Sequence, residues 1–114
     1  MNKIISKINA DYYTWGEQCD GWYLCKNEKL HVIQERMPCG TGEKMHYHHY
    51  STQVFYILSG NALFIIDQQE YRVSAGQSIR IEPGQIHCIQ NQDDQDLNFL
   101  VISVPPSQTD RVNI

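Results

Sequence analysis

The amino-acid sequence predicts an all-β fold, and three observations support this. From Leu30 onward, short segments rich in Val, Ile, Phe and Tyr alternate with turn residues every eight to twelve positions, which is typical of a β-sandwich or β-barrel. No segment longer than about ten residues shows the apolar period of an α-helix. Roughly eight candidate strands are present, the number at which an antiparallel sheet closes or folds into two packed sheets.

Length, composition and charge indicate one globular domain that acts on a small molecule. The chain has 114 residues, of which 41% are hydrophobic and 11% are aromatic, so it can build a core without disulfide or metal staples. Its net charge is −4 and it has no basic cluster. A nucleic-acid surface is therefore excluded, because phosphate binding needs concentrated Lys and Arg. The same charge disfavours an anionic membrane surface.

The first residues and the cysteines predict a cytoplasmic protein. Residues 1–7 are positively charged, but their apolar stretch ends after two residues, far short of a signal sequence or a membrane span. No Cys-x-x-Cys pair is present, so free thiols that pack as small hydrophobic groups are expected, with a metal or redox role as the alternative. The four cysteines are Cys19, Cys25, Cys39 and Cys88.

Three parts of the domain are distinguished along the chain. Residues 1–27 form an aromatic N-terminal arm, in which Tyr and Trp are punctuated by glycines without a helical period. Such an arm either covers one side of its own domain or packs on a second subunit. Residues 28–106 form the predicted barrel, and residues 107–114 form a C-terminal tail.

The barrel strands are recognised from the turns between them. Residues 59–61 (Ser-Gly-Asn) are a three-residue hairpin connection in which glycine allows a positive φ. Residues 82–85 (Glu-Pro-Gly-Gln) form a strong turn, and two prolines end the last strand at Pro105. The predicted strands cover residues 30–37, 53–58, 62–67, 71–73, 78–81, 86–90 and 97–104.

Four of the five histidines predict one metal site. Residues two apart on a strand project from the same face, so His46 and His48 point together into the barrel, whereas His49 points outward unless a bulge resets the alternation. An antiparallel barrel can bring His87 across from them. Three neutral imidazoles suit a divalent transition metal and leave positions open for water or substrate. The alternative is a polar strand face beside a surface histidine.

Two sequence motifs resemble those of the cupin family. Gly40, His46-x-His48, Gln53 and Gly60 keep the spacing of the first cupin motif, which carries Glu at the position of Gln53. The second motif is matched by a separate set of residues, in which Glu82 stands at the place of a proline that here follows it directly. This set is Gly76, Glu82-Pro83-Gly84, His87 and Asn91.

The resemblance implies a double-stranded β-helix, or jelly roll, with a metal at one end of the barrel. It also implies frequent homodimerisation through N-terminal strands. The metal would be one divalent ion, zinc, iron, nickel, copper or manganese, and Gln53 would join the histidines around it. The implied ligand set is His46, His48, Gln53 and His87.

The amide of Gln53 leaves three interpretations open. It keeps one acceptor oxygen but lacks the charge and basicity of a carboxylate. It is a weak fourth ligand, a residue that orients a histidine or a water, or the mark of a site that has lost its metal. Neutral ligands would leave the metal its full positive charge, which favours an anionic or enolate-like ligand and lowers the affinity for hard ions such as Mn²⁺.

The sequence leaves three classes of function open. The first is a metal-dependent oxygenase or isomerase that acts on a small organic molecule, the second is a non-catalytic sensor or carrier, and the third is a purely structural barrel. No acid or base stands out: the four candidates could reach a barrel cavity from neighbouring strands, but each is expected to be a solvated or strand-edge residue. They are Glu35, Arg36, Tyr56 and Glu82. Core and wall positions are expected for Phe55, Phe64, Ile65, Cys88 and Phe99.

Overall fold

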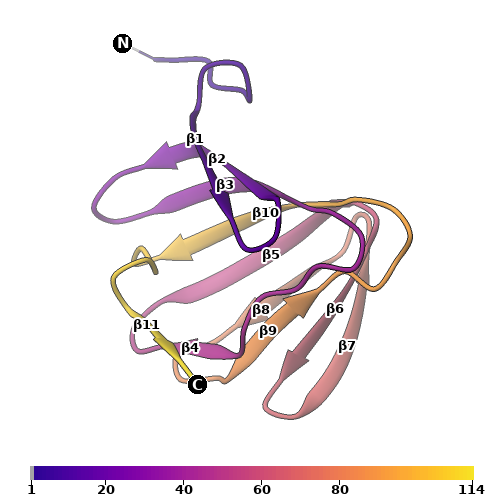
Figure 1. Cartoon of the computed structure of the whole chain (residues 1–114). Coiled ribbons are helices and arrows are strands. Elements are labelled where there is room, and N and C mark those ends of the chain that lie inside the picture. The colour runs from indigo at the N-terminus through magenta and orange to yellow at the C-terminus, as the bar shows by residue number, and fades with distance from the viewer. Residues whose placement is uncertain (1) are drawn as a thin grey trace.

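The computed structural model describes residues 2–114 and confirms the all-β prediction (Figure 1). Two antiparallel sheets contain all the strands, in the orders β1-β2-β3-β10-β5-β8 and β11-β4-β9-β6-β7. The strands are β1 (Asp11–Trp15), β2 (Cys19–Lys26), β3 (His31–Met37), β4 (His46–His48), β5 (Thr52–Ser59), β6 (Asn61–Ile66), β7 (Gln69–Ser74), β8 (Ser78–Ile81), β9 (His87–Gln90), β10 (Leu97–Val104) and β11 (Arg111–Asn113).

The core lies between the two sheets and is built from alternating apolar residues of both. Phe55 on β5 packs against Phe64 on β6 with ring centroids 5.0 Å apart, and against Phe99 on β10 at 5.7 Å. All three rings are buried, as predicted, whereas Ile65 is only half-buried because it faces away from them. The alternation of one strand therefore selects which side chains enter the core.

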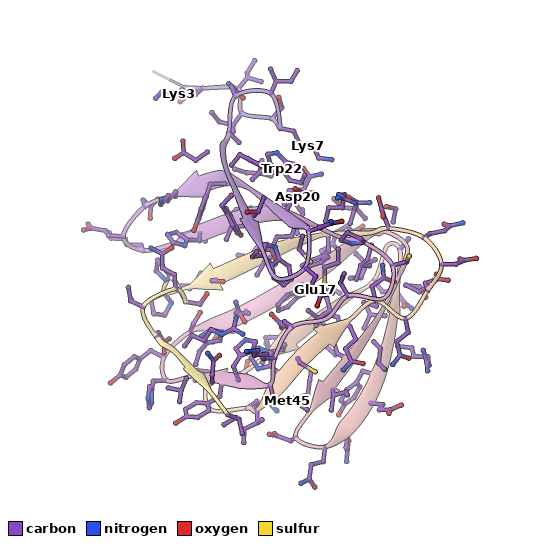
Figure 2. The ribbon with its side chains drawn as sticks, viewed as in Figure 1. Lys3, Lys7, Glu17, Asp20, Trp22 and Met45 are labelled. Atoms are coloured by element: carbon purple, nitrogen blue, oxygen red, sulfur yellow. The ribbon has the colours of Figure 1, made fainter. Side chains whose placement is uncertain are left out.

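The N-terminal arm contains two strands that the sequence did not reveal. β1 and β2 form a hairpin, and β2 pairs with β3, so the arm extends the larger sheet (Figure 1). Two glycines and several polar residues interrupt its apolar pattern, which hides the period of two. The ammonium of Lys7 lies 4.6 Å from the Trp22 ring and ties the preceding segment to β2 (Figure 2).

The segment before β1 exposes two large apolar side chains, Ile4 at 93% and Ile8 at 95%. Such side chains are more often covered, and a second subunit is one way to cover them. The homodimer stays a prediction, as does the cytoplasmic location. Within residues 2–114 there is no helix with the length and apolarity needed to cross a bilayer.

The C-terminal segment also forms a strand, β11, at the edge of the five-stranded sheet. β11 pairs with β4, and the register places Arg111 opposite His48 and Asn113 opposite His46. The carboxylate of Asp110 accepts hydrogen bonds from the backbone N–H groups of three consecutive residues, 49–51. The chain end is therefore held beside the histidine strand.

The glycine that ends the first motif is required by a close approach of the backbone. Gly60 connects β5 to β6 with φ of 88°, in the region that favours glycine. A Cβ atom at this position would lie 2.7 Å from the carbonyl oxygen of Asp96. The predicted turn at Gly60 is thus confirmed, but the predicted hairpin is wrong, because β5 pairs with β10 and β8 whereas β6 pairs with β7 and β9, so the turn carries the chain from one sheet to the other. The loop before β10 explains why this glycine cannot easily be replaced.

Candidate metal centre

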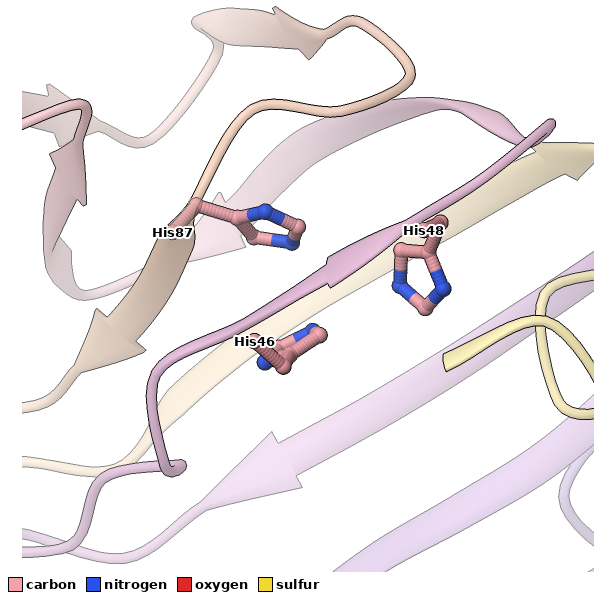
Figure 3. A group of neighbouring side chains, drawn as sticks. All are labelled: His46, His48 and His87. Carbon is pink, nitrogen blue, oxygen red and sulfur yellow. The ribbon is translucent and has the colours of Figure 1, made fainter. Parts of the chain in front are cut away.

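Three histidines converge in the smaller sheet (Figure 3). β4 presents His46 and His48 on one face, and the antiparallel pairing of β4 with β9 sets His87 opposite His46. The side chains are buried, and one ligand nitrogen of each lies within 4.8 Å of the others. His46, His48 and His87 can therefore hold a metal ion, whereas His49 is exposed and points away from this group, as the strand alternation predicted.

Backbone carbonyls fix the orientation of two of the rings. Nδ1 of His46 lies 2.7 Å from the carbonyl oxygen of Lys44, and Nδ1 of His87 lies 2.9 Å from that of Gln85. Because a carbonyl oxygen only accepts, each Nδ1 carries the hydrogen and each Nε2 keeps a free lone pair. Metal-binding histidines ordinarily make such a hydrogen bond with the ring nitrogen that does not bind the metal.

Burial keeps the three imidazoles neutral. Desolvation lowers the pKa of His46 to about 3 and that of His48 to about 4. It also lowers the pKa of His87, although the Gln85 carbonyl opposes the shift. The rings are therefore unprotonated at neutral pH, as metal ligands must be.

Three buried polar atoms among the described residues have no hydrogen-bond partner: Nδ1 of His48, Nε2 of His87 and Oε1 of Gln53. A buried acceptor without a partner costs about 1–3 kcal/mol. All three atoms carry lone pairs, so a cation would satisfy them. The donor set, two or three nitrogens with an amide oxygen, suits a transition metal rather than calcium or magnesium.

The side chain of Gln53, on β5, is held in place by hydrogen bonds from its amide nitrogen. Its Nε2 donates to the hydroxyls of Ser103, at 3.0 Å, and Ser107, at 3.3 Å. These two bonds leave Oε1 free within the same cavity as the histidines. The geometry fits both a fourth ligand and a residue that orients a water, so the ligand role of Gln53 stays a prediction.

His46 and His48 open into a cavity of about 290 Å³, just below the range of ligand pockets, which span about 300–1,000 Å³. Strands from both sheets, the loop before β4 and the C-terminal segment all contribute to its wall. The polar lining residues are Tyr13, Tyr23, His31, Glu35, Glu43, His46, His48, Gln53, Ser103, Ser107, Gln108 and Arg111.

Glu35 corrects an expectation from the sequence. It lies on β3 and was expected at the surface or at an edge, yet it is half-buried and lines the cavity. Desolvation raises the pKa of its carboxyl to about 7. The addition of β1 and β2 to the sheet makes β3 an interior strand, and this covers Glu35. Tyr56 and Glu82 are exposed as expected, and Arg36 is occupied by ion pairs with Asp20 and Asp96.

Glu43 was missed by the sequence reasoning. Its Oε1 lies 4.0 Å from Nε2 of His46 and accepts a hydrogen bond from the backbone of Ile89. Burial raises the pKa of its carboxyl to about 8. A pairing of Gly42 with Gln90 turns the loop inward and brings Glu43 to the site. No local pattern in the sequence marks this long-range contact.

Arg111 was also missed, because the C-terminal segment carries no strand pattern. Its guanidinium lines the cavity, and Nε donates to Oδ1 of Asn113 at 2.8 Å. The distance from Nη1 to Oε2 of Glu43 is 3.9 Å, too long for a hydrogen bond. Its positive charge reaches the site, where it opposes protonation of all three histidines.

The chain is similar in sequence to two curated proteins and in fold to a solved structure. An uncharacterised protein of Methanocaldococcus jannaschii is 32% identical over 83 residues, a match that covers 73% of this chain and 66% of that protein, just under two thirds of its length. The oxalate-binding protein of Thermotoga maritima is 28% identical over 87 residues, 72% of each chain. The structure of KdgF from Halomonas sp. superposes with a TM-score of 0.84 at 13% identity, over 96% of this chain and 98% of that one, and thus shares the fold.

The family model described as a cupin domain matches residues 33–103. This range includes both motifs and all three histidines, but it leaves out β1, β2 and β11, which supply Tyr13, Tyr23 and Arg111 to the cavity. The fold, the motif spacing and the converging histidines agree with this match. The chain belongs to the cupin family.

Proposed function

We propose that this cupin is a divalent-metal-dependent enzyme that acts on a small organic anion through isomerase-type chemistry. The observation that carries the proposal is the set of three buried, unpartnered acceptor atoms on His48, Gln53 and His87. His48 and Gln53 line one cavity together with the guanidinium of Arg111, and His87 lies in the same histidine group as His48. A divalent ion bound there would supply Lewis-acid polarisation of a substrate oxygen. Zinc, iron, nickel, copper and manganese all remain candidates.

The charges around the cavity favour an anion. The histidines and Gln53 contribute no charge, so a bound divalent ion would keep its full charge beside that of Arg111. These positive charges exceed those of Glu35 and Glu43 even when both carboxyls are ionised. Among residues 2–114, the Nη groups of Arg111 make no hydrogen bond, and Nη1 lies 3.9 Å from Oε2 of Glu43. A guanidinium in this state suits bidentate binding of a carboxylate.

Proton transfer is favoured over oxygen chemistry by what else lines the cavity. Glu35 and Tyr13 reach the same cavity as the histidines, with a hydrogen bond of 2.6 Å from the phenol to the carboxylate. An isomerase needs a group that removes and returns a proton, and a carboxylate whose pKa lies near neutrality serves this purpose. An oxygenase has no such requirement.

A second candidate function is non-catalytic binding of a small anion. It is supported by the relative from Thermotoga maritima, whose printed name is oxalate-binding protein. To separate these functions, metal-loaded protein should be incubated with sugar acids, diketones and phenols, and both product formation and oxygen consumption should be measured. A product without oxygen uptake supports the isomerase, oxygen uptake supports an oxygenase, and saturable binding without a product supports the binding protein.

Replacing Arg111 with methionine is expected to weaken anion binding by at least about tenfold, because a hydrogen bond to a charged group contributes about 1.5–3 kcal/mol. The probe is malonate, compared with its neutral diamide, and binding to zinc-loaded protein is measured by calorimetry. Arg80→Met is the matched control, since Arg80 is exposed and forms an ion pair with Glu82 away from the cavity. Equal affinities of the wild type and the Arg111 variant for malonate would contradict the anion proposal, while unchanged zinc content would show that the metal site is intact.

A further inference from the structure

One residue on each of β1, β2 and β3 lies directly opposite the next, and the three form one row across these strands. Tyr13 on β1 pairs with Gly21 on β2, and Gly21 pairs with Glu35 on β3. The row ends at the cavity, which both Tyr13 and Glu35 line. Two of the three residues precede the range that matches the cupin domain, so the family match includes only Glu35 of this row.

The Tyr13 ring lies over Gly21. A Cβ atom at Gly21 would be 2.1 Å from Cζ of Tyr13 and 2.5 Å from its hydroxyl oxygen. Only a residue without a side chain leaves room for the ring. The phenol thereby crosses a whole strand and donates a hydrogen bond of 2.6 Å to Oε2 of Glu35. The glycine on β2 is therefore what allows Tyr13 to reach the carboxylate.

Glu35 has the environment of a proton-transfer group rather than that of a structural ion pair. Within residues 2–114, no Lys, Arg or His nitrogen lies within salt-bridge distance of its carboxylate, which is half-buried. Burying a carboxylate without a counter-ion costs free energy. Carboxylates in such surroundings are therefore candidates for a functional role. The only side-chain hydrogen bond to it among the described residues is that from Tyr13.

We infer that Glu35 is the catalytic residue that takes the substrate proton and returns it, and that Tyr13, admitted by Gly21, positions it. This inference rests on the proposed isomerase-type function. In the forward step, a C–H bond next to the substrate carbonyl breaks, the Glu35 oxygen gains the proton, and the electron pair remains on the substrate as an enolate. In a substrate with a hydroxyl on the carbon that lost the proton, the proton returns to the former carbonyl carbon while the hydroxyl proton moves to the former carbonyl oxygen, so that the hydroxyl carbon becomes the new carbonyl. This regenerates the Glu35 carboxylate, and no oxidant or reductant is consumed.

The pH dependence follows from the groups that surround Glu35. The ionised form removes the proton, so the rate should rise with pH through the pKa of Glu35, which desolvation raises and the Tyr13 hydrogen bond lowers. Loss of that hydrogen bond should move the rise to higher pH. The titratable and charged groups that face Glu35 are Tyr13 on β1, Cys19 and Tyr23 on β2, Glu43 in the loop before β4, and Arg111 on β11.

The test uses full-length zinc-loaded protein and 2-oxobutanoate, whose C3 protons exchange with D₂O when they are removed, with exchange followed by proton NMR. Glu35→Gln should lower the exchange rate by at least about 100-fold, the usual contribution of a general base. Tyr13→Phe should lower it by about tenfold, the worth of a hydrogen bond to a charged group. Gly21→Ala should resemble Tyr13→Phe, because it keeps both groups but separates them.

A second readout needs neither metal nor substrate. Carboxyl ¹³C NMR of metal-free protein gives the pKa of Glu35, which should rise in both Tyr13→Phe and Gly21→Ala. The matched controls are Glu70→Gln and Tyr71→Phe on the exposed strand β7, where the Tyr71 hydroxyl binds only Gln69. Neither control should change the exchange rate or the pKa.

The outcomes separate this inference from the proposed function. If loaded wild-type protein exchanges the probe and Glu35→Gln does so equally well, the inference is overturned and the metal-dependent enzyme stands. If neither Tyr13→Phe nor Gly21→Ala moves the Glu35 pKa, the positioning role is overturned. If loaded wild-type protein exchanges no protons, the isomerase-type function fails together with the inference.

Discussion

Replacing His87 with alanine is expected to remove the bound metal from the protein. The wild type should carry about one equivalent of a single divalent ion, as mononuclear histidine sites do. His87 contributes a fixed, neutral and unpartnered Nε2 to the centre, so its loss leaves two protein nitrogens and a weak amide. Metal content of untagged protein, measured by mass spectrometry, should fall to less than about a tenth of an equivalent, and His46→Ala should behave in the same way.

The matched control is His49→Ala. His49 neighbours the site in sequence but is exposed and lies on the other side of the strand, so its variant should keep the metal. If the wild type stays metal-free after incubation with iron, zinc, nickel, copper and manganese, the metal proposal is contradicted. In that case, tight binding by Gln53→Glu would identify a site that lost its metal with its carboxylate.

Replacing Phe64 with alanine is expected to destabilise the fold by about 3–5 kcal/mol, the usual cost of deleting a buried aromatic ring. Phe64 is 0% exposed and packs edge-to-face on Phe55, with centroids 5.0 Å apart. Phe55 is itself packed against Phe99, with centroids 5.7 Å apart. Urea unfolding of metal-free protein, followed by tryptophan fluorescence, measures the change without a contribution from metal binding.

Tyr71→Ala provides the comparison for this experiment. Tyr71 is the cross-strand neighbour of Phe64 on β7, but its side chain is 41% exposed. Its loss should cost no more than about 1 kcal/mol. If both variants lost equal stability, the apolar contact between the sheets would not be the main source of the stability of this fold.

The histidine centre was predictable because its geometry is local. Alternation along a strand places His46 and His48 on one face and excludes His49, whatever the rest of the chain does. The position of His87 needed one further assumption, an antiparallel pairing of its strand with the first, and the register of β4 and β9 satisfies it. The turn at Gly60 was equally predictable, since a turn is determined by a few adjacent residues, but its flanking strands β5 and β6 join different sheets instead of forming the predicted hairpin.

The surroundings of the metal centre were not predictable in this way. Glu35 was expected at the surface, because nothing in its own segment shows that β2 will cover it. Glu43 reaches His46 only after Gly42 has paired with Gln90, a contact between distant segments. Such side chains become neighbours through pairings that the local pattern of neither segment records.

The sequence by itself therefore determined the all-β class, the cupin motifs and the three histidines, because strand alternation and motif spacing are properties of short segments. Only the tertiary structure decided what faces the histidines. The row from Tyr13 through Gly21 to Glu35 needs two strand registers at once, and Arg111 enters the cavity only because β11 pairs with β4. Register depends on the packing of whole sheets, so the residues that would choose and transform a substrate become visible only after the chain has folded.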